Sequence, residues 1–202
     1  LLKTDLADPY IWTLAIVFGI RMLMTPMLNA GIYHNIHKTH TDEKRSFLEG
    51  VRRWSLPFLL LYILQTVLAF APLLWLVPRV EPMLAGLMAG RVDSQLPLLL
   101  AGYLLYTAVV KLAVMYMQFG IVAKTGWFRS MRVLLTRFPM IAALSALILG
   151  IYALAAAAGV TLSILSAGFV AIVLHQVYHL IKAMFKLWEI GTQHQYFAAR
   201  TH

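Results

Sequence analysis

The chain contains the stretch MIAALSALILGIYALAAAA from Met140 to Ala158, nineteen residues without a charged side chain. A transmembrane helix needs about 20 mostly apolar residues, so this stretch alone predicts a helix inside a lipid bilayer. Hydrophobic residues make up 61% of the 202 residues, and charged residues only 12%. A soluble domain carries about twice that charged share. The composition excludes a water-soluble globule and a disordered chain, and it indicates an integral membrane protein.

Five stretches have the length and apolarity of a membrane span. They cover residues 10–33, 55–77, 96–122, 140–158 and 162–188, with a tight turn expected near Gly159. Their apolar runs are continuous and do not alternate, which favours helices over barrel strands. We therefore expect a single polytopic all-α domain over residues 1–202, with five spans and a sixth upstream of Leu1.

Basic residues predict the orientation of this bundle. The chain has 17 Lys and Arg against 8 Asp and Glu, a net charge of +9. Eleven of the basic residues fall in the connections 34–54 and 123–138 and in the C-terminal tail, and three fall on the other side. The positive-inside rule then places the C-terminus in the cytoplasm, in a multi-pass protein of a bacterial inner membrane. We expect anionic lipid headgroups as partners, and no nucleic acid.

Each basic connection contains an amphipathic segment followed by a proline that opens the next span. In the first, Phe47, Leu48, Val51 and Trp54 lie opposite Arg45, Glu49, Arg52 and Arg53. In the second, Trp127, Phe128, Met131, Leu134 and Leu135 lie opposite Arg129, Arg132 and Thr136. Such helices lie in the plane of the membrane interface, so two interfacial elbow helices are expected.

The helix–elbow–helix pattern occurs about two and a half times in the same orientation. Arg21 precedes Gly31 as Lys111 precedes Gly120 and Lys182 precedes Gly191, at spacings of ten, nine and nine residues. This similarity predicts internal repeats over approximately residues 10–77 and 96–158, with a half repeat over 162–197. Parallel repeats are found in transporters, and they also arise by duplication in proteins that transport nothing.

Arg21, Lys111 and Lys182 lie within apolar stretches, where a cation costs roughly 2.5 kcal/mol or more unless it pairs or reaches the interface. They are candidates for an anion site, and the alternative is that they extend to the headgroups or bind freed carbonyls. Headgroup contacts are also expected for basic residues of the elbows. The candidates there are Arg45, Arg52, Arg129 and Arg132.

Two groups of histidines have helical spacing. His34, His37 and His40 are three residues apart, and His175 and His179 are four apart. Such pairs are compatible with haem, pigment or metal ligation. The alternatives are an exposed interfacial tract for the first group and hydrogen bonds between helices for the second. The sequence assigns no cofactor and leaves haem, pigment or a metal as alternatives.

Catalytic signatures are absent from the sequence. It has no cysteine, no P-loop, no Gly-x-Ser-x-Gly elbow, no His-Glu-x-x-His and no paired carboxylates within a span. A non-enzymatic role is therefore favoured, and the activity stays open. The small residues from Ala153 to Ala158, with Gly150, favour close helix contact within the bundle or with other membrane subunits.

The elbows SFLEGVRRW (Ser46–Trp54) and WFRSMRVLLTR (Trp127–Arg137), each leading into a proline-opened span, resemble those of bacterial six-helix membrane proteins. That group includes the membrane domain attached to some glycerophosphodiester phosphodiesterases. The resemblance covers most of the chain and implies a six-helix bundle. It implies no catalytic residue, because the phosphodiester-cleaving domain is not part of this chain.

Three functions are compatible with these features. The first is a non-enzymatic accessory subunit or lipid-engaging scaffold of a larger membrane assembly. The second is a transporter or flippase-like protein that moves an anionic amphiphile along Arg21, Lys111 and Lys182. The third is a haem- or pigment-associated subunit of a redox or photosynthetic complex that uses His175 and His179.

Overall fold

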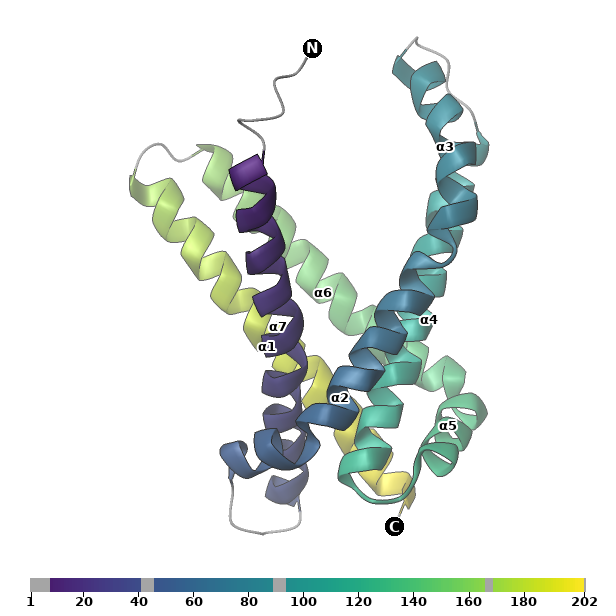
Figure 1. The fold of residues 1–202 in the computed structure, drawn as a ribbon, viewed down its shortest axis with the longest axis vertical. Helices are drawn as coiled ribbons and strands as arrows, with labels where there is room; N and C mark the ends of the chain where they lie inside the picture. The colour runs from purple at the N-terminus through teal and green to yellow at the C-terminus, as the bar shows by residue number, and fades with distance from the viewer. Residues whose placement is uncertain (1–7, 41–45, 89–93, 166–168, 202) are drawn as a thin grey trace. The chain divides into compact units, whose positions relative to one another are not determined.

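The computed structural model describes residues 8–40, 46–88, 94–165 and 169–201 (Figure 1). These residues form helices and contain no strand, as expected from the sequence. Four segments are long and apolar enough to cross a membrane: Tyr10–Thr39, Phe47–Gly86, Gln95–Val122 and Phe138–Thr161. Large apolar side chains on them, such as Leu14 and Leu105, are each 68% exposed. Soluble proteins do not expose apolar surface on this scale, so the protein is a helical membrane protein.

The chain divides into two compact units, residues Leu1–Val122 and Ala123–His202. Unit 1 contains four helices: α1 (Asp8–His40), α2 (Phe47–Phe70), α3 (Leu73–Met88) and α4 (Gln95–Val122). Unit 2 contains three: α5 (Trp127–Thr136), α6 (Phe138–Leu165) and α7 (Phe169–Thr201). Each unit is held together by its own contacts.

An aromatic cluster forms the core of unit 1. Tyr33 on α1 meets Phe58 on α2 edge to face, with ring centroids 5.4 Å apart. The Tyr33 ring also lies 5.1 Å from that of Phe119 on α4, and Phe119 in turn meets Tyr116 at 5.7 Å. All four rings are at most 4% exposed. The cluster therefore joins α1, α2 and α4 through edge-to-face and tilted ring pairs.

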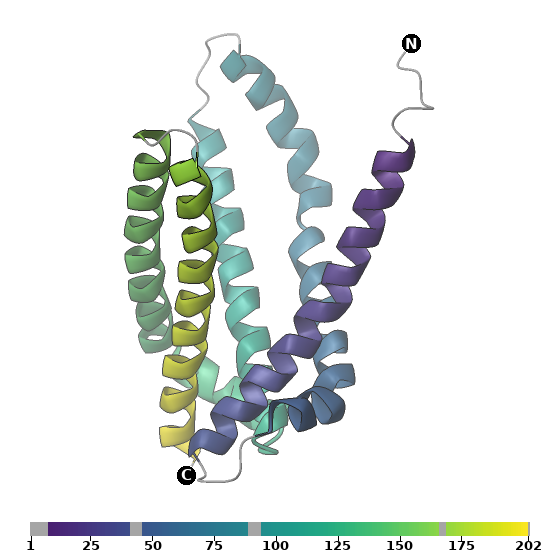
Figure 2. The same ribbon diagram turned by 90° about the vertical axis from the view of Figure 1, so that its left-hand side faces the viewer.

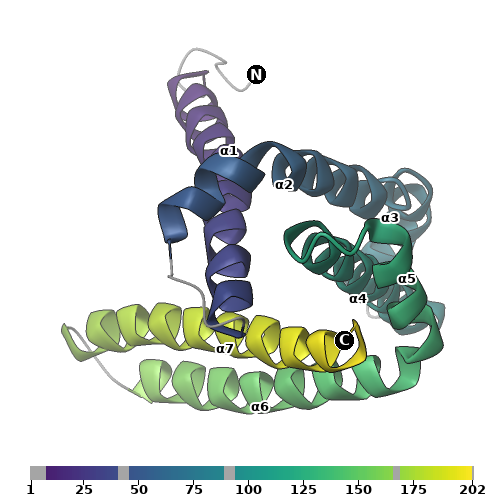
Figure 3. The same ribbon diagram turned by 90° about the horizontal axis from the view of Figure 1, so that it is seen from below.

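Two glycines let α1 and α2 cross closely. The start of α2 lies across α1 (Figure 3). A Cβ at Gly50 would lie 2.5 Å from Cβ of His34 and 3.1 Å from the carbonyl oxygen of Ala30. A Cβ at Gly31 would overlap the ring of Phe47. The crossing therefore depends on the absence of a side chain at Gly50, where the neighbours are a Cβ and a backbone oxygen, whereas the Phe47 ring beside Gly31 is the end of a side chain that can move.

The first elbow differs from the sequence-based expectation, which placed a separate interfacial helix before Pro57. Residues 47–70 form one continuous helix, α2, with Pro57 inside it. Its first turn begins at Ser46, whose Oγ accepts a hydrogen bond from the backbone N–H of Glu49 at 3.3 Å. Pro57 has no backbone N–H and therefore removes one helical hydrogen bond, and a proline bends a helix without ending it when its neighbours pack. The elbow is thus the first part of α2.

The end of α2 is also different from the expected continuous span over 55–77. The helix ends at Phe70, and α3 begins at Leu73 after Pro72 and continues through Pro78 and Pro82 to Met88. Because Pro72 has no N–H, the carbonyl of Leu68 loses its helical partner. The hydroxyl of Tyr106 donates to this carbonyl at 3.0 Å, and that of Tyr103 donates to the carbonyl of Ala69 at 3.1 Å. Two tyrosines of α4 therefore satisfy backbone groups at a helix break where lipid offers no replacement.

Tyr106→Phe should lower the free energy of unfolding by about 1 kcal/mol, and the double variant with Tyr103→Phe by about 2 kcal/mol. Each change removes one hydroxyl and leaves a carbonyl without a donor. Thermal unfolding in one mild detergent measures the effect. Tyr10→Phe, which removes a hydroxyl from a side chain that is 71% exposed, is the control. Equal shifts in all three variants would contradict the role of the hydroxyls.

Unit 2 is built on an antiparallel pair, α6 and α7, which run side by side (Figure 2). Gln193 on α7 is fully buried and donates to the carbonyl of Ile141 at 3.2 Å and to Oγ of Ser145 at 2.9 Å. Nearer the other end, the hydroxyls of Tyr152 and Tyr178 share a hydrogen bond of 2.7 Å. The two polar contacts fix the register of the pair.

The prediction of a tight turn near Gly159 is wrong, because α6 continues through Gly159 to Leu165. The alanine-rich run around it has high helix propensity, which offsets the cost of one glycine, about 1 kcal/mol. The nearest atom to a Cβ at Gly159 would be a ring carbon of Tyr178 at 3.8 Å. The fifth expected span, 162–188, falls on the end of α6 and on α7 and includes residues 166–168, which lie outside the described residues. The count of five spans stays a prediction.

Candidate anion-binding site

The site begins with the way α5 is held in unit 2. Gly126 precedes the helix with φ of 84°, a backbone conformation that glycine adopts without strain. The helix packs through one edge, where Ser130 is fully buried and Leu134 is 2% exposed. Arg132 is two residues from both, roughly 200° around the helix from each. The packing of Ser130 and Leu134 therefore turns Arg132 away from the core of unit 2.

Beside the buried edge, α5 exposes large apolar side chains. Trp127 is 54%, Phe128 77% and Leu135 72% exposed, and the rings of Trp127 and Phe128 lie 4.7 Å apart. An isolated helix in water would not leave these side chains uncovered. A basic side next to an exposed aromatic side is the amphipathic pattern expected from the sequence, and the position of α5 in the membrane interface stays a prediction.

Four arginines gather around one cavity of about 550 Å³ in unit 2. Arg129 and Arg132 come from α5, Arg137 from its C-cap position, and Arg200 from the last turn of α7. Phe128 and Thr136 also line the cavity. The hydroxyl of Thr136 donates to the carbonyl of Arg132 at 2.8 Å, so its oxygen is left to accept. The cavity thus joins a cationic wall to an apolar one.

The electrostatics of this cavity favour an anion. A guanidinium keeps its charge at any physiological pH and presents a fork of donors that fits phosphate oxygens. None of the residues that line the cavity is acidic. Arg200 also lies over the ring of Tyr196, one turn earlier on α7, at 5.9 Å from its centroid, so the Arg200 side chain packs along its own helix. Four like charges around one space are an arrangement that a bound anion stabilises.

The sequence predicted part of this site. Arg129 and Arg132 were candidates, and the structure brings them together with Arg137 and Arg200, which the sequence analysis counted only for orientation. Arg137 follows α5 directly, so its place at the end of the amphipathic segment was a usable signal. Arg200 is 68 positions after Arg132, and only the packing of α5 near α7 brings it to the cavity.

The basic candidates of the first elbow do not form a comparable cavity among the described residues. Arg52 is exposed on α2, and the neighbouring Arg53 lies 5.2 Å from the ring centroid of Trp54. Arg45 lies outside the described residues. The expected headgroup contacts of Arg45 and Arg52 stay predictions.

The three cations within apolar helices have exposed positions. Arg21 is on α1 and Lys111 on α4, both in unit 1, and Lys182 is on α7 in unit 2. An exposed position on a spanning helix is compatible with extension to the headgroups. None of the three lines the arginine cavity. Their convergence on one anion stays a prediction.

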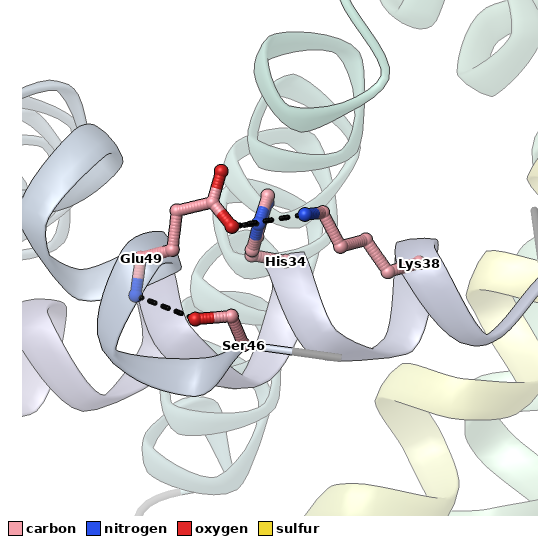
Figure 4. A network of polar contacts seen from close by, with 4 residues as sticks. All are labelled: His34, Lys38, Ser46 and Glu49. Atoms are coloured by element: carbon pink, nitrogen blue, oxygen red, sulfur yellow. Dashed lines mark hydrogen bonds and ion pairs between the residues drawn. The ribbon is translucent and has the colours of Figure 1, made fainter. Parts of the chain in front are cut away.

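His34 belongs to a polar network at the crossing of α1 and α2 (Figure 4). Nζ of Lys38 donates to Oε2 of Glu49 at 2.9 Å, and Nε2 of His34 lies 3.8 Å from the same oxygen. The network joins the last turns of α1 to the first turn of α2. His34 is only 5% exposed, so the expectation of an exposed tract is wrong for this residue. The reason is Gly50, which lets α2 cover it.

The other histidines give no metal centre in the described part of the chain, where no group of three His, Asp or Glu side chains has suitable geometry. His37 is half-buried, and His179 is exposed beside the ring of Tyr178, at 6.0 Å. The side chains of His40 and His175 lie outside the described residues. Ligation by His175 and His179 stays a prediction.

The small residues of α6 form an apolar groove of about 590 Å³, lined by Ala146, Gly150 and Ala153 among others. A Cβ at Gly150 would meet no atom within 4 Å. This face of α6 is therefore open to lipid or to another helix. The contact with a partner subunit expected from these residues stays a prediction.

Comparison with protein-family models, with curated proteins and with solved structures finds no match for the chain. The resemblance to bacterial six-helix membrane proteins therefore stays a prediction. The inference about function rests on the cavity and its surroundings.

Proposed function

We propose that this protein is a non-enzymatic, multi-pass protein of a bacterial inner membrane that binds anionic lipid headgroups at the cytoplasmic face. It would serve a larger membrane assembly as an accessory subunit or scaffold. The observation that carries the proposal is the cavity lined by Arg129, Arg132, Arg137 and Arg200, next to the exposed aromatic side of α5.

The distribution of charge supports the cytoplasmic side. The connection that contains α5 and the C-terminal tail are both rich in basic residues, whereas the segments expected on the opposite side hold three basic residues in all. The positive-inside rule assigns such segments to the cytoplasm. The cytoplasmic leaflet carries the anionic surface potential that attracts basic segments, by about 1 kcal/mol for each Lys or Arg near the surface.

The geometry of α5 supports binding of a headgroup at a defined depth. Trp127, Phe128 and Leu135 expose the apolar surface that enters the acyl boundary. The arginines on the other side of the helix then lie at the level of the phosphates. The residues that line the cavity include no His, Cys, Asp or Glu that could act as acid, base or nucleophile. Binding is therefore better supported than catalysis.

Phosphatidylglycerol binding to the purified full chain in detergent, measured by native mass spectrometry against phosphatidylcholine, tests the proposal. The double variant Arg132→Gln/Arg137→Gln should weaken phosphatidylglycerol binding roughly 30-fold, because each arginine contributes about 1 kcal/mol. Phosphatidylcholine binding should change little, because this lipid has no net charge.

A matched control removes two arginines of the first elbow, in the variant Arg52→Gln/Arg53→Gln. These side chains are exposed and do not line the cavity, so we expect their loss to weaken binding in the cavity less than threefold. If both double variants lose binding equally, a diffuse basic surface binds the lipid, and the cavity has no special role. A wild-type protein without preference for phosphatidylglycerol would refute the proposed function itself.

A further inference from the structure

We propose that the arginine cavity selects lipids whose headgroup ends in a phosphomonoester or a diphosphate, ahead of lipids with a single phosphodiester. This inference rests on the proposed function and names the class of lipid that the cavity takes. It follows from the size of the cavity, the type of its cations, the number of oxygens they can bind, and its apolar edge.

The size of the cavity and the directions from which its arginines come suit a group with several oxygens. Its volume of about 550 Å³ falls in the range of about 300–1,000 Å³ that small-molecule sites occupy. The arginines approach it from three places: α5, the junction of α5 and α6, and the end of α7. A group with oxygens on several sides can contact all of them, whereas the two free oxygens of a phosphodiester contact few.

The cations that line the cavity are all arginines, which favours phosphate as the ligand. The cavity takes four of the ten arginines in the chain and none of its seven lysines. The positive-inside rule does not distinguish arginine from lysine, so orientation alone does not account for this selection. Arginine differs from lysine in its planar fork, which forms paired hydrogen bonds to phosphate oxygens.

The charge and the number of oxygens of the phosphate can be compared with what the guanidinium groups supply. Arg132, Arg137 and Arg200 supply three guanidinium charges beside Arg129, and none of the residues that line the cavity is acidic. A phosphodiester brings one negative charge and two non-bridging oxygens. A phosphomonoester brings up to two charges and three such oxygens, and a terminal diphosphate brings up to three charges and five oxygens. The last two groups satisfy more of the guanidinium donors and leave less charge uncompensated.

The apolar edge indicates that the phosphate belongs to a lipid. Phe128 lines the cavity and is 77% exposed, and it lies on the same side of α5 as Trp127 and Leu135. A headgroup bound among the arginines therefore has its apolar part next to the surface that enters the membrane. A free anion would gain nothing from this neighbour.

Competition between lipids with identical acyl chains tests the inference on the purified full chain at roughly 0.15 M salt. We expect phosphatidic acid, a phosphomonoester, to bind about tenfold more tightly than phosphatidylglycerol, and phosphatidylglycerol more tightly than phosphatidylcholine. Equal binding of the two anionic lipids, both above phosphatidylcholine, would overturn the inference and leave the proposed function standing. Equal binding of all three would overturn both.

Two further experiments test whether the phosphate belongs to a lipid and whether the planar guanidinium groups are needed. Inorganic pyrophosphate at equal concentration should not displace phosphatidic acid, and full displacement would show a site for free anions. The variant Arg132→Lys/Arg200→Lys keeps the charge and loses two forks, so the preference for phosphatidic acid over phosphatidylglycerol should fall to about twofold or less. An unchanged preference would contradict selection by guanidinium forks. The matched control is Arg52→Lys/Arg53→Lys on α2, which should keep the wild-type preference.

Discussion

Gly50→Val should lower the free energy of unfolding by about 3 kcal/mol. A Cβ at this position would lie 2.5 Å from Cβ of His34 and 3.1 Å from the carbonyl oxygen of Ala30. Neither atom is the far end of a flexible side chain, so the backbones of α1 and α2 must separate. Overpacking of this kind costs about 1–3 kcal/mol, and the branched side chain of valine puts the effect at the upper end.

The separation would also disturb the contacts at the crossing. Lys38 and Glu49, which join at 2.9 Å, lie on the two helices that must move apart. The unfolding midpoint in mild detergent should fall by on the order of 10 °C. Gly102→Val on α4 is the matched control, because a Cβ there meets no atom within 4 Å. Similar midpoints for the two variants would show that α1 and α2 do not cross as closely as the structure has them.

Hydropathy was sufficient to predict the membrane helices, and it was not sufficient to predict how they meet. The spans around Tyr10–Thr39 and Gln95–Val122 follow from long apolar runs, which report only on the solvent around a helix. The crossing at Gly31 and Gly50 depends on contacts between residues of different helices. The spacing of the histidines therefore favours an exposed tract that includes His34, whereas the approach of Gly50 buries this residue.

Helix ends were also difficult to predict from the sequence. Whether a glycine or a proline ends a helix depends on the residues around it and on contacts with other helices. A glycine near the end of an apolar run indicated a turn at Gly159, yet the helix continues because the surrounding alanines favour it. Pro72 gave no expectation of a break, although the missing N–H frees the carbonyl of Leu68. The hydroxyl of Tyr106, 38 residues further on, makes this break tolerable.

The candidate site shows the same limit at the level of single side chains. Arg129 and Arg132 could be predicted because they share the basic side of one amphipathic segment. Arg200 could not, because its place at the cavity depends on the packing of α7 near α5 and on the pairing of α6 with α7. That pairing is fixed in part by Gln193, whose two hydrogen bonds to α6 have no signature in the sequence.

Phe58→Ala should produce the largest loss of stability in unit 1, about 3–5 kcal/mol. The ring of Phe58 is fully buried and meets Tyr33 edge to face, with centroids 5.4 Å apart. The substitution removes the apolar burial of the ring and leaves a cavity between α1 and α2. It also removes the pairing of the Phe58 and Tyr33 rings, which contributes about 0.5–1.5 kcal/mol. Phe58→Leu refills most of that cavity, so its loss should be less than half as large.

Phe70→Ala on the same helix is the matched control, since it removes the same atoms from a side chain that is 58% exposed. In detergent or lipid the space that it leaves is filled by acyl chains, so no cavity remains and the loss should be below about 1 kcal/mol. Unfolding midpoints of the three variants in one detergent give the comparison. If Phe58→Ala and Phe70→Ala were equally mild, the aromatic cluster would not be the core of unit 1. The stability of α1 against α2 would then have to come from the glycine crossing alone.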